Sequence, residues 1–210
     1  MAQEKDDAWL RIWEQIDNAN LVPEHDQRKQ EIESAISELR QLLESGQKWT
    51  LYPLGYAYYC HPDRQPGSPM SSQVDSFLRL AISENVEPEL ARLYLAFQRY
   101  DEKRFEESRD LVGQVPLENL HENIAIRCAE LQLCNHLWIG PQAEYPARLF
   151  DFATYIASLS EPAIEPLLLM SLLEHLAERN ALTDCQAALV ELDRAYPILS
   201  GHWFRDVVCR

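Results

Sequence analysis

The sequence predicts an all-α fold made of a series of helix pairs. Apolar residues recur at intervals of three and four along most segments, which is the period of an amphipathic helix. No segment alternates apolar and polar residues for long enough to indicate a strand. Proline, glycine and asparagine residues interrupt the apolar pattern at intervals that match the length of ordinary helices.

Residues 7–45 are expected to form an N-terminal pair of helices. The first helix, 7–20, and the second, 23–45, each carry one apolar stripe, formed by Trp9, Ile12, Trp13 and Ile16 and by Ile32, Ile36, Leu39 and Leu43. A short aromatic helix over 49–60 follows, and then the proline-rich loop 61–69, the longest irregular stretch expected. Ser71 or Ser72 is expected to cap the next helix, whose buried face is formed by Val74, Phe77, Leu78 and Ala81.

Helices are also expected over most of the C-terminal half. Pro88 suits the first turn of a helix over 88–100, because its fixed backbone angle is helical and its missing N–H has no partner there. After a polar turn, 101–104, helices are expected over 105–112, 117–139, 145–159, 162–179 and 183–196. The tail, 200–208, is expected to form a last short helix packed by Trp203 and Val207.

The composition is that of a globular protein. Of the 210 residues, 46% are hydrophobic and 25% are charged, which argues against a disordered chain and allows one or two compact units. We expect a single helical domain, 1–210, in which the helix pair 7–45 packs on helical hairpins formed by 48–210.

The charge balance excludes one class of partner. Lysine and arginine number 19 and aspartate and glutamate 34, so the formal net charge is −15. Because the phosphates of DNA and RNA would be repelled by such a surface, we expect no nucleic-acid partner.

Cysteine spacing and hydropathy indicate a cytoplasmic protein. The five cysteines follow neither a zinc-binding nor a paired spacing, so no metal and no disulfide are expected of Cys60, Cys128, Cys134, Cys185 and Cys209. The first residues are polar and acidic, without the apolar core of a signal peptide. The most apolar run, 167–173, is far too short to span a membrane, so no membrane partner is expected either.

Several expected helix pairs resemble tetratricopeptide-type hairpins, in which two antiparallel helices pack around small residues. The resemblance covers about residues 48–197 and is carried by Leu54, Gly55 and Tyr58, by Leu95, Ala96, Phe105 and Ser108, and by Leu172, Leu182, Cys185, Leu189 and Pro197. It implies an α-solenoid of stacked helix hairpins, in which Gly55 lets the partner helix approach and Tyr58 fills the remaining gap. Residues 117–160 do not follow this register.

Four aromatic residues share one face of the expected helix 49–60: Trp49, Tyr52, Tyr56 and Tyr59. The resemblance implies that this face lines a concave groove and that Leu90, Leu93, Phe97 and Tyr100 line the next rung. Exposed tyrosines bind proteins well, because a rigid ring buries a large area while its hydroxyl still forms hydrogen bonds. The alternative is that this face packs against the apolar stripes of the N-terminal helix pair.

Acidic residues are concentrated in the second expected hairpin: Glu84, Glu87, Glu89, Asp101, Glu102, Glu106, Glu107 and Asp110. They are interpreted either as a solvated face that keeps the protein soluble or as a surface that steers a basic protein into contact.

Catalytic constellations are weak in this sequence. A histidine lies near an acid or a cysteine in four places, namely His61 with Asp63, His121 with Glu122, Cys134 with His136, and His175 with Glu174 and Glu178. None of them forms a metalloprotease motif, a phosphate-binding loop or a nucleophile elbow. We therefore expect no catalytic residue, no metal and no cofactor, and we interpret these histidines as surface or interface residues.

The sequence favours a non-enzymatic cytosolic protein that binds another protein, one that is basic, through an acidic and aromatic helical surface. Its most concrete form is an immunity or antitoxin-type inhibitor of a basic toxin domain; a secretion chaperone or adaptor is closely related. The expected partner-binding residues are Trp49, Tyr52, Tyr56, Tyr59, Phe97, Tyr100, Asp101, Glu102, Glu106 and Glu107. The alternative is a helical enzyme or small-molecule-binding module that uses the His61 loop and adjacent tyrosines. The oligomeric state is left open.

Overall fold

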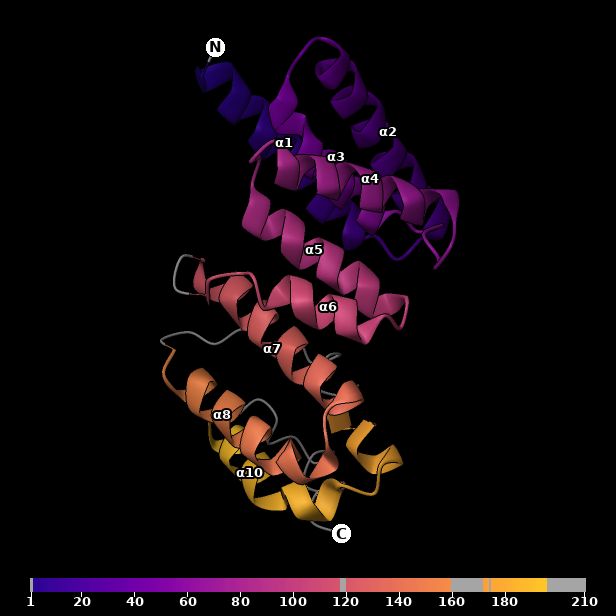
Figure 1. Ribbon diagram of the computed structural model, residues 1–210. Coiled ribbons are helices and arrows are strands. Elements are labelled where there is room, and N and C mark those ends of the chain that lie inside the picture. Colours follow the sequence, from indigo (N-terminus) through magenta and orange to yellow (C-terminus); the bar gives the residue numbers. More distant parts are fainter. Residues whose placement is uncertain (1, 118–119, 160–171, 174, 196–210) are drawn as a thin grey trace. The chain divides into compact units, whose positions relative to one another are not determined.

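The all-α fold is confirmed by the computed structural model of the chain, which describes residues 2–117, 120–159, 172–173 and 175–195. Within these residues every regular element is a helix (Figure 1). The chain divides into two compact units, Met1–Arg104 and Phe105–Arg210, which are described separately below. The expectation of a single domain stays a prediction.

The first unit contains α1 (Ala2–Asn20), α2 (His25–Glu44), the short 3₁₀ helix η1 (Lys48–Thr50), α3 (Leu51–Cys60), α4 (Pro69–Ser83) and α5 (Pro88–Asp101). Each α-helix packs against the next one along the chain, and α3 also contacts both α1 and α5. The helices α1, α3 and α5 therefore follow one another as a row. The side chains that face each other along this row decide where the aromatic residues of the unit lie.

The start of α4 corrects one expectation from the sequence. Ser68, not Ser71 or Ser72, caps this helix, and its Oγ accepts a hydrogen bond of 3.2 Å from the backbone N–H of Ser71. Pro69 occupies the first helical position, where its missing N–H leaves no bond unmade. Because proline fixes the helix start there, Ser71 and Ser72 lie inside the first turn.

Gly55 allows α3 and α4 to approach each other closely. A Cβ atom at this position would lie 2.7 Å from Leu78 Cγ and 3.3 Å from the Leu78 backbone nitrogen. Three residues further on, the ring of Tyr58 stacks on Phe77 of α4, with centroids 5.7 Å apart. This is the packing that the tetratricopeptide resemblance implies for Gly55 and Tyr58, while membership of that family stays a prediction.

The second unit contains α6 (Phe105–Val112), α7 (Glu122–Ile139), the 3₁₀ helix η3 (Gln142–Glu144), α8 (Tyr145–Ala157) and α10 (Leu182–Ala195). Residues 172–173 and 175–178 are also helical. In this unit α6 packs on α7, α7 on α8, and α8 on α10. The helix expected over 117–139 begins later, at Glu122, because the backbone of His121 is not helical.

The core of the second unit is mainly aliphatic. It consists of Ile126, Leu133, Leu137, Tyr145, Leu149, Phe152, Ala153, Ile156, Leu172, Leu173, Leu176, Ala181, Cys185, Ala188, Leu189 and Leu192. Leu182, Cys185 and Leu189, which carried part of the repeat resemblance, therefore lie in or against this core. The expected tail helix with Trp203 and Val207 lies outside the described residues, as do residues 160–171 of the expected helix 162–179 and of the chain before it.

The hydropathy of the helices and the state of the cysteine thiols can also be described. Among the described residues, no helix combines the length and the apolar character needed to cross a membrane. Cys60, Cys128, Cys134 and Cys185 are free thiols, and Cys209 lies outside the described residues. Burial raises the pKa of Cys128 to about 12 and that of Cys185 to about 11, so both thiols stay protonated at neutral pH.

Candidate functional site

Aromatic rings form a continuous cluster along α1, α3 and α5. This aromatic row consists of Trp9, Trp13, Trp49, Tyr52, Tyr56, Tyr59, Tyr94 and Phe97. Its closest contacts join the ring of Trp13 to that of Tyr56, with centroids 4.6 Å apart, and Tyr56 to Tyr94 at 4.7 Å. Offset and edge-on contacts of this kind stabilise the packing beyond the apolar area that they bury.

Burial separates the expected binding residues into two groups. Tyr52 is fully buried and Tyr56 is 6% exposed, because α1 places Trp9 and Trp13 over this face of α3. The core-packing alternative therefore applies to both tyrosines, and the expectation that they are exposed anchors is corrected. By contrast, Trp49, Tyr59, Phe97 and Tyr100 remain half-buried.

The two buried tyrosines differ in their hydroxyl groups. The hydroxyl of Tyr56 donates a hydrogen bond of 2.8 Å to Asp17 Oδ1. The hydroxyl of Tyr52 is buried and has no hydrogen-bond partner among the described residues. Burial raises the pKa of both phenols well above the ordinary value, so neither can act as an acid or base near neutral pH.

Three carboxylates lie near rings of the aromatic row. Burial is the main reason why the pKa of Tyr52 is raised, and the negative charges of Glu87 and Asp17 add to the effect. The pKa of Tyr59 is raised by burial and, next, by the charge of Asp101. These effects require the three carboxylates to lie near the rings, so acidic and aromatic groups share one region of the first unit.

Arg64 shows how a cation binds in this region. Its guanidinium carbon lies 4.1 Å from the centroid of the Tyr59 ring, which is a cation–π contact. The same side chain donates to the backbone oxygen of Tyr59 at 2.7 Å and to Asp101 Oδ2 at 2.8 Å. Asp101, an expected binding residue, is therefore paired within the unit, although it remains exposed at its edge.

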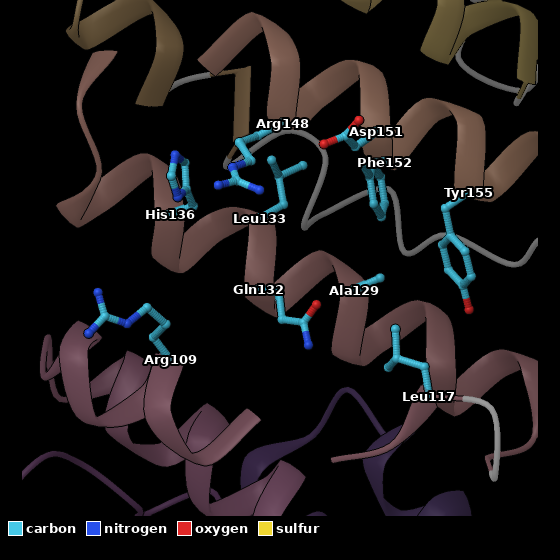
Figure 2. Close-up of a pocket in the computed structure, with 10 residues that line it drawn as sticks. All are labelled: Arg109, Leu117, Ala129, Gln132, Leu133, His136, Arg148, Asp151, Phe152 and Tyr155. Atoms are coloured by element: carbon cyan, nitrogen blue, oxygen red, sulfur yellow. The ribbon is translucent and has the colours of Figure 1, made fainter. Parts of the chain in front are cut away.

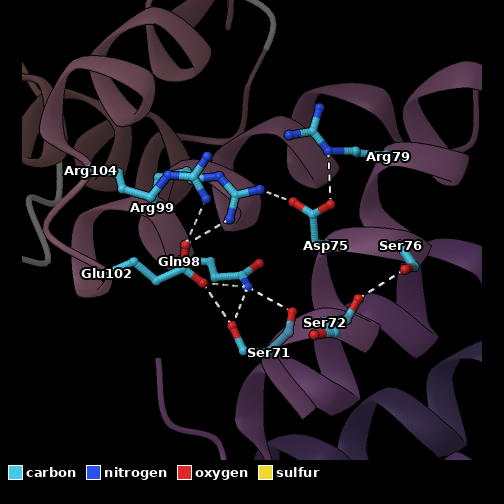
Figure 3. Close-up of polar contacts among 9 residues, drawn as sticks. All are labelled: Ser71, Ser72, Asp75, Ser76, Arg79, Gln98, Arg99, Glu102 and Arg104. Carbon is cyan, nitrogen blue, oxygen red and sulfur yellow. Dashed lines mark hydrogen bonds and ion pairs between the residues drawn. The ribbon is translucent and has the colours of Figure 1, made fainter. Parts of the chain in front are cut away.

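Glu102 belongs to an internal polar network, shown in Figure 3. Its carboxylate accepts hydrogen bonds from Ser71 at 2.7 Å, Gln98 at 3.0 Å, Arg99 at 2.9 Å and Arg104 at 3.2 Å. Burial disfavours its charge, but these hydrogen bonds and the charge of Arg99 together lower its pKa. The expectation that Glu102 is an exposed binding carboxylate is therefore corrected, since it connects α4 to the end of α5.

The other two expected carboxylates lie in the second unit. Glu106 and Glu107 are exposed in the first turn of α6, where negative charge is favoured by the helix dipole. Asp110, one turn further on, lies 3.2 Å from the guanidinium of Arg109. The two glutamates are compatible with a binding surface, and that role stays a prediction.

His61 and Asp63 are held by structural contacts. The side chain of His61 is fully buried, and its Nδ1 accepts a hydrogen bond of 3.1 Å from the Asp63 backbone N–H. Asp63 contacts Lys29 Nζ at 2.6 Å and His25 Nε2 at 3.1 Å, which fastens the loop to α2. Burial lowers the pKa of His61, so this ring stays neutral near neutral pH.

His175 also has structural contacts. His175 is buried, its Nε2 lies 2.8 Å from the Leu137 carbonyl oxygen, and its ring packs against Trp138. Glu174, its expected neighbour, lies outside the described residues. Within the described part of the chain, no three histidine, cysteine, aspartate or glutamate side chains are placed so that they could bind a metal ion.

A groove of about 470 Å³ lies in the second unit, between α7 and α8 (Figure 2). It is lined by Arg109, Leu117, Ala129, Gln132, Leu133, His136, Arg148, Asp151, Phe152 and Tyr155. Of these residues, the sequence analysis singled out only His136, and for a different pairing. The available signal was a common spacing: residues 129, 132, 133 and 136 and residues 148, 151, 152 and 155 each repeat at i, i+3, i+4 and i+7.

This spacing indicates a groove only when the two helices are known to face each other, and no local sequence pattern shows that they do. The aromatic row has the same limitation, since the sequence did not decide what covers it. No protein-family model, curated protein or solved structure matches this chain, so both sites are interpreted from their own geometry.

Proposed function

We propose that this chain is a non-enzymatic protein-binding protein that recognises a basic partner through an aromatic and acidic surface of its first unit. The observation that carries the proposal is that half-buried rings and exposed carboxylates coincide there. Trp49, Tyr59 and Phe97 are half-buried residues of the aromatic row. Glu87 and Asp101 are exposed, and their charges act on Tyr52 and on Tyr59 of the same cluster, respectively.

The contacts of Arg64 support this proposal, because they use the same chemistry within one chain. A single guanidinium lies over the ring of Tyr59 and pairs with Asp101. Lysine and arginine side chains of a basic partner would find further ring edges and carboxylates of this kind along α1, α3 and α5. Cation–π contacts and ion pairs combine well at such sites, since both attract the same charged group.

The charge distribution supports a basic partner. The chain has 34 acidic and 19 basic residues. Many of the basic residues are already paired with carboxylates, namely Arg11, Lys29, Lys48, Arg64, Arg79, Arg99, Arg104, Arg109, Arg148 and Arg194. The surplus of negative charge therefore remains uncompensated, and it would accelerate association with a positively charged protein.

The arrangement of the first unit supports stacked hairpins. The helices α1, α3 and α5 follow one another while α2 and α4 connect them, which is the order of contacts that the tetratricopeptide resemblance implies. A small acidic helical protein of this kind suits an immunity or antitoxin-type inhibitor that covers the active surface of a basic toxin domain. This is the most concrete form of the proposal.

The test identifies the partner and then measures its kinetics. The tagged chain is used to capture proteins from its own cells at low ionic strength, and a captured basic protein is identified by mass spectrometry. Surface plasmon resonance at two ionic strengths then compares the wild type with the double variant Glu87→Gln, Asp101→Asn. The matched control is Asp26→Asn, Glu44→Gln, which removes the same charge from exposed positions of α2.

We expect the Glu87/Asp101 variant to associate several-fold more slowly than the wild type at low salt and the control variant to differ little. The difference should disappear at high salt, because exposed charges are then screened. Phe97→Ala should instead accelerate dissociation, as loss of a contact ring does. Equal slowing in both charge variants, binding that does not depend on salt, or no basic partner would contradict the proposal.

A further inference from the structure

We propose that the groove between α7 and α8 binds an amphipathic monocarboxylate, a small molecule with one carboxylate and an apolar chain or ring. This site lies wholly in the second unit and is independent of the aromatic row. Its volume of about 470 Å³ lies within the range of roughly 300–1,000 Å³ that is usual for small-molecule sites.

The basic side chains that line the groove lie together at one of its ends. On α7 the lining residues run from Ala129 to His136, and on α8 they run from Arg148 to Tyr155. Because η3 and a tight turn join the end of α7 to the start of α8, His136 and Arg148 lie at the same end. Figure 2 shows Arg109 of α6 at this end as well, so three helices each supply one basic side chain.

The electrostatics of His136 support this convergence. Its pKa is lowered first by burial and then by the positive charges of Arg148 and Arg109, while Glu144 acts in the opposite direction. Two guanidinium groups can influence one imidazole only if both lie near it. The basic end of the groove is therefore a local concentration of positive charge in a chain whose net charge is −15.

The guanidinium groups at this end retain capacity for an anion. Arg148 is 52% exposed, and its contact with Glu144 is long, at 3.5 Å. Arg109 is 53% exposed and lies 3.2 Å from Asp110. A guanidinium has five N–H donors, so one carboxylate neighbour leaves others available for a ligand. Asp151 lines the groove on the side of α8 and is the one acidic residue among the described residues of its lining.

The opposite end of the groove is apolar. Leu133 and Phe152 belong to the core of the unit and form the floor, and Leu117 and Tyr155 lie furthest from the arginines in Figure 2. Arg148 and Tyr155 are seven residues apart on α8, which corresponds to about 10 Å along the helix. A carboxylate held at the arginines would therefore place a chain of medium length along the apolar floor.

The experiment uses decanoate as the probe and the full-length chain as the protein. Isothermal titration calorimetry compares the wild type with Arg148→Gln and with the control Arg79→Gln. The two arginines are matched, since they are 52% and 55% exposed and each pairs with a carboxylate four residues earlier in the chain. Decyltrimethylammonium has a tail of the same length and a positive head group. Its binding measures how strongly the negative net charge of the chain attracts an amphipathic molecule without an anionic head group.

We expect one decanoate per chain, an affinity about tenfold weaker in Arg148→Gln, and no change in Arg79→Gln. Arg109→Gln, on a different helix, should also weaken binding, and circular dichroism checks that each variant folds. No binding of decanoate by the wild type would overturn the proposal. Equal weakening in the Arg148 and Arg79 variants, or tighter binding of decyltrimethylammonium than of decanoate, would overturn it as well.

Discussion

The two units of this protein are both helical and both bury many aliphatic side chains, but the first unit adds a continuous row of aromatic rings. The first unit packs α1, α3 and α5 through tryptophan and tyrosine rings, whereas the second packs α7, α8 and α10 mainly through leucine, isoleucine and alanine. Tryptophan and tyrosine rings carry polar groups and have preferred contact geometries, while aliphatic side chains have neither. The row of rings in the first unit therefore combines packing with hydrogen bonds and nearby carboxylates, whereas the second unit places basic side chains at one end of a groove.

This contrast explains why the two candidate sites differ in kind. In the first unit, burial of Tyr52 and Tyr56 leaves only the outer rings of the row available to a partner. In the second unit, an apolar floor and arginines on separate helices border a space of small-molecule size. The predictions below test the contrast, beginning with the largest expected effect.

A charge in either core should unfold its unit. Leu95 of α5 and Leu189 of α10 are fully buried, so Leu95→Asp and Leu189→Asp each place a carboxylate where it has no water. We expect each change to cost more than about 4 kcal/mol in the free energy of unfolding. Urea denaturation followed by circular dichroism measures this cost.

The matched controls are Leu80→Asp and Val190→Asp, which are 43% and 38% exposed and lie on α4 and α10. They should cost far less, because their carboxylates remain hydrated. A variant of Leu95 or Leu189 that melts at the wild-type temperature would show that the helix faces are assigned wrongly.

Close packing between α3 and α4 predicts the next effect. Gly55→Ala forces a methyl group against Leu78, which has to move together with its backbone. We expect a loss of about 1–3 kcal/mol in the free energy of unfolding, measured by urea denaturation. In the double variant Gly55→Ala, Leu78→Ala, the loss in the free energy of unfolding should be smaller than the sum of the losses in the two single variants, because the shorter side chain makes room for the new methyl group. A double-mutant cycle measures this difference. Strict additivity of the two changes would mean that the two residues do not interact.

The two buried tyrosine hydroxyls predict unequal effects of the same substitution. Tyr56→Phe removes the hydrogen bond to Asp17 and leaves this carboxylate without its donor, at an expected cost of about 1–2 kcal/mol. Tyr52→Phe removes a hydroxyl that has no partner among the described residues, so it should be neutral or slightly stabilising. Thermal denaturation of both variants compares them, and an equal cost would show that the Tyr52 hydroxyl also has a partner.

The smallest expected effect concerns pH. Burial lowers the pKa of His61 below that of the unfolded chain, so the unfolded state binds the proton first as the pH falls. The contribution of neutral His61 to stability is therefore complete above the unfolded pKa of about 6.5 and is lost as the pH falls toward the folded pKa.

Urea denaturation at pH 7.5 and pH 5.5, compared between the wild type and His61→Gln, measures this loss. The stability difference between the two proteins should shrink at the lower pH. Carboxylates such as Asp63 and Glu38, whose pKa values are lowered, ionise well below this range and do not contribute to the change. A difference that stays constant with pH would contradict the assignment to His61.

Much of the local structure could be predicted from the sequence. The periods of three and four gave α5 and α6 to within one residue, because each helix buries one stripe and ends at a turn or a proline. Gly55 and Tyr58 were also identified as packing residues. The start of α4 and the start of α7 were wrong, since several caps were possible in each place and the pattern does not choose among them.

The candidate sites depended more on long-range contacts. The sequence identified Trp49, Tyr52, Tyr56 and Tyr59 as one face, but the position of α1 decided that Tyr52 and Tyr56 are buried. Glu102 looked like a surface carboxylate, yet contacts with Ser71, 31 residues away, make it internal. The groove between α7 and α8 was missed, because its residues become neighbours only when the two helices pack.

By itself the sequence determined the helical class, the approximate limits of the helices and a net charge of −15, because these follow from local periodicity and from counting residues. The tertiary structure alone decided which rings are covered, which carboxylates are paired and where the arginines of α6 and α8 meet His136. The physical reason is that burial and electrostatic interaction act between atoms that are close in space. Such atoms are often far apart along the chain, and no local pattern records the distance between them.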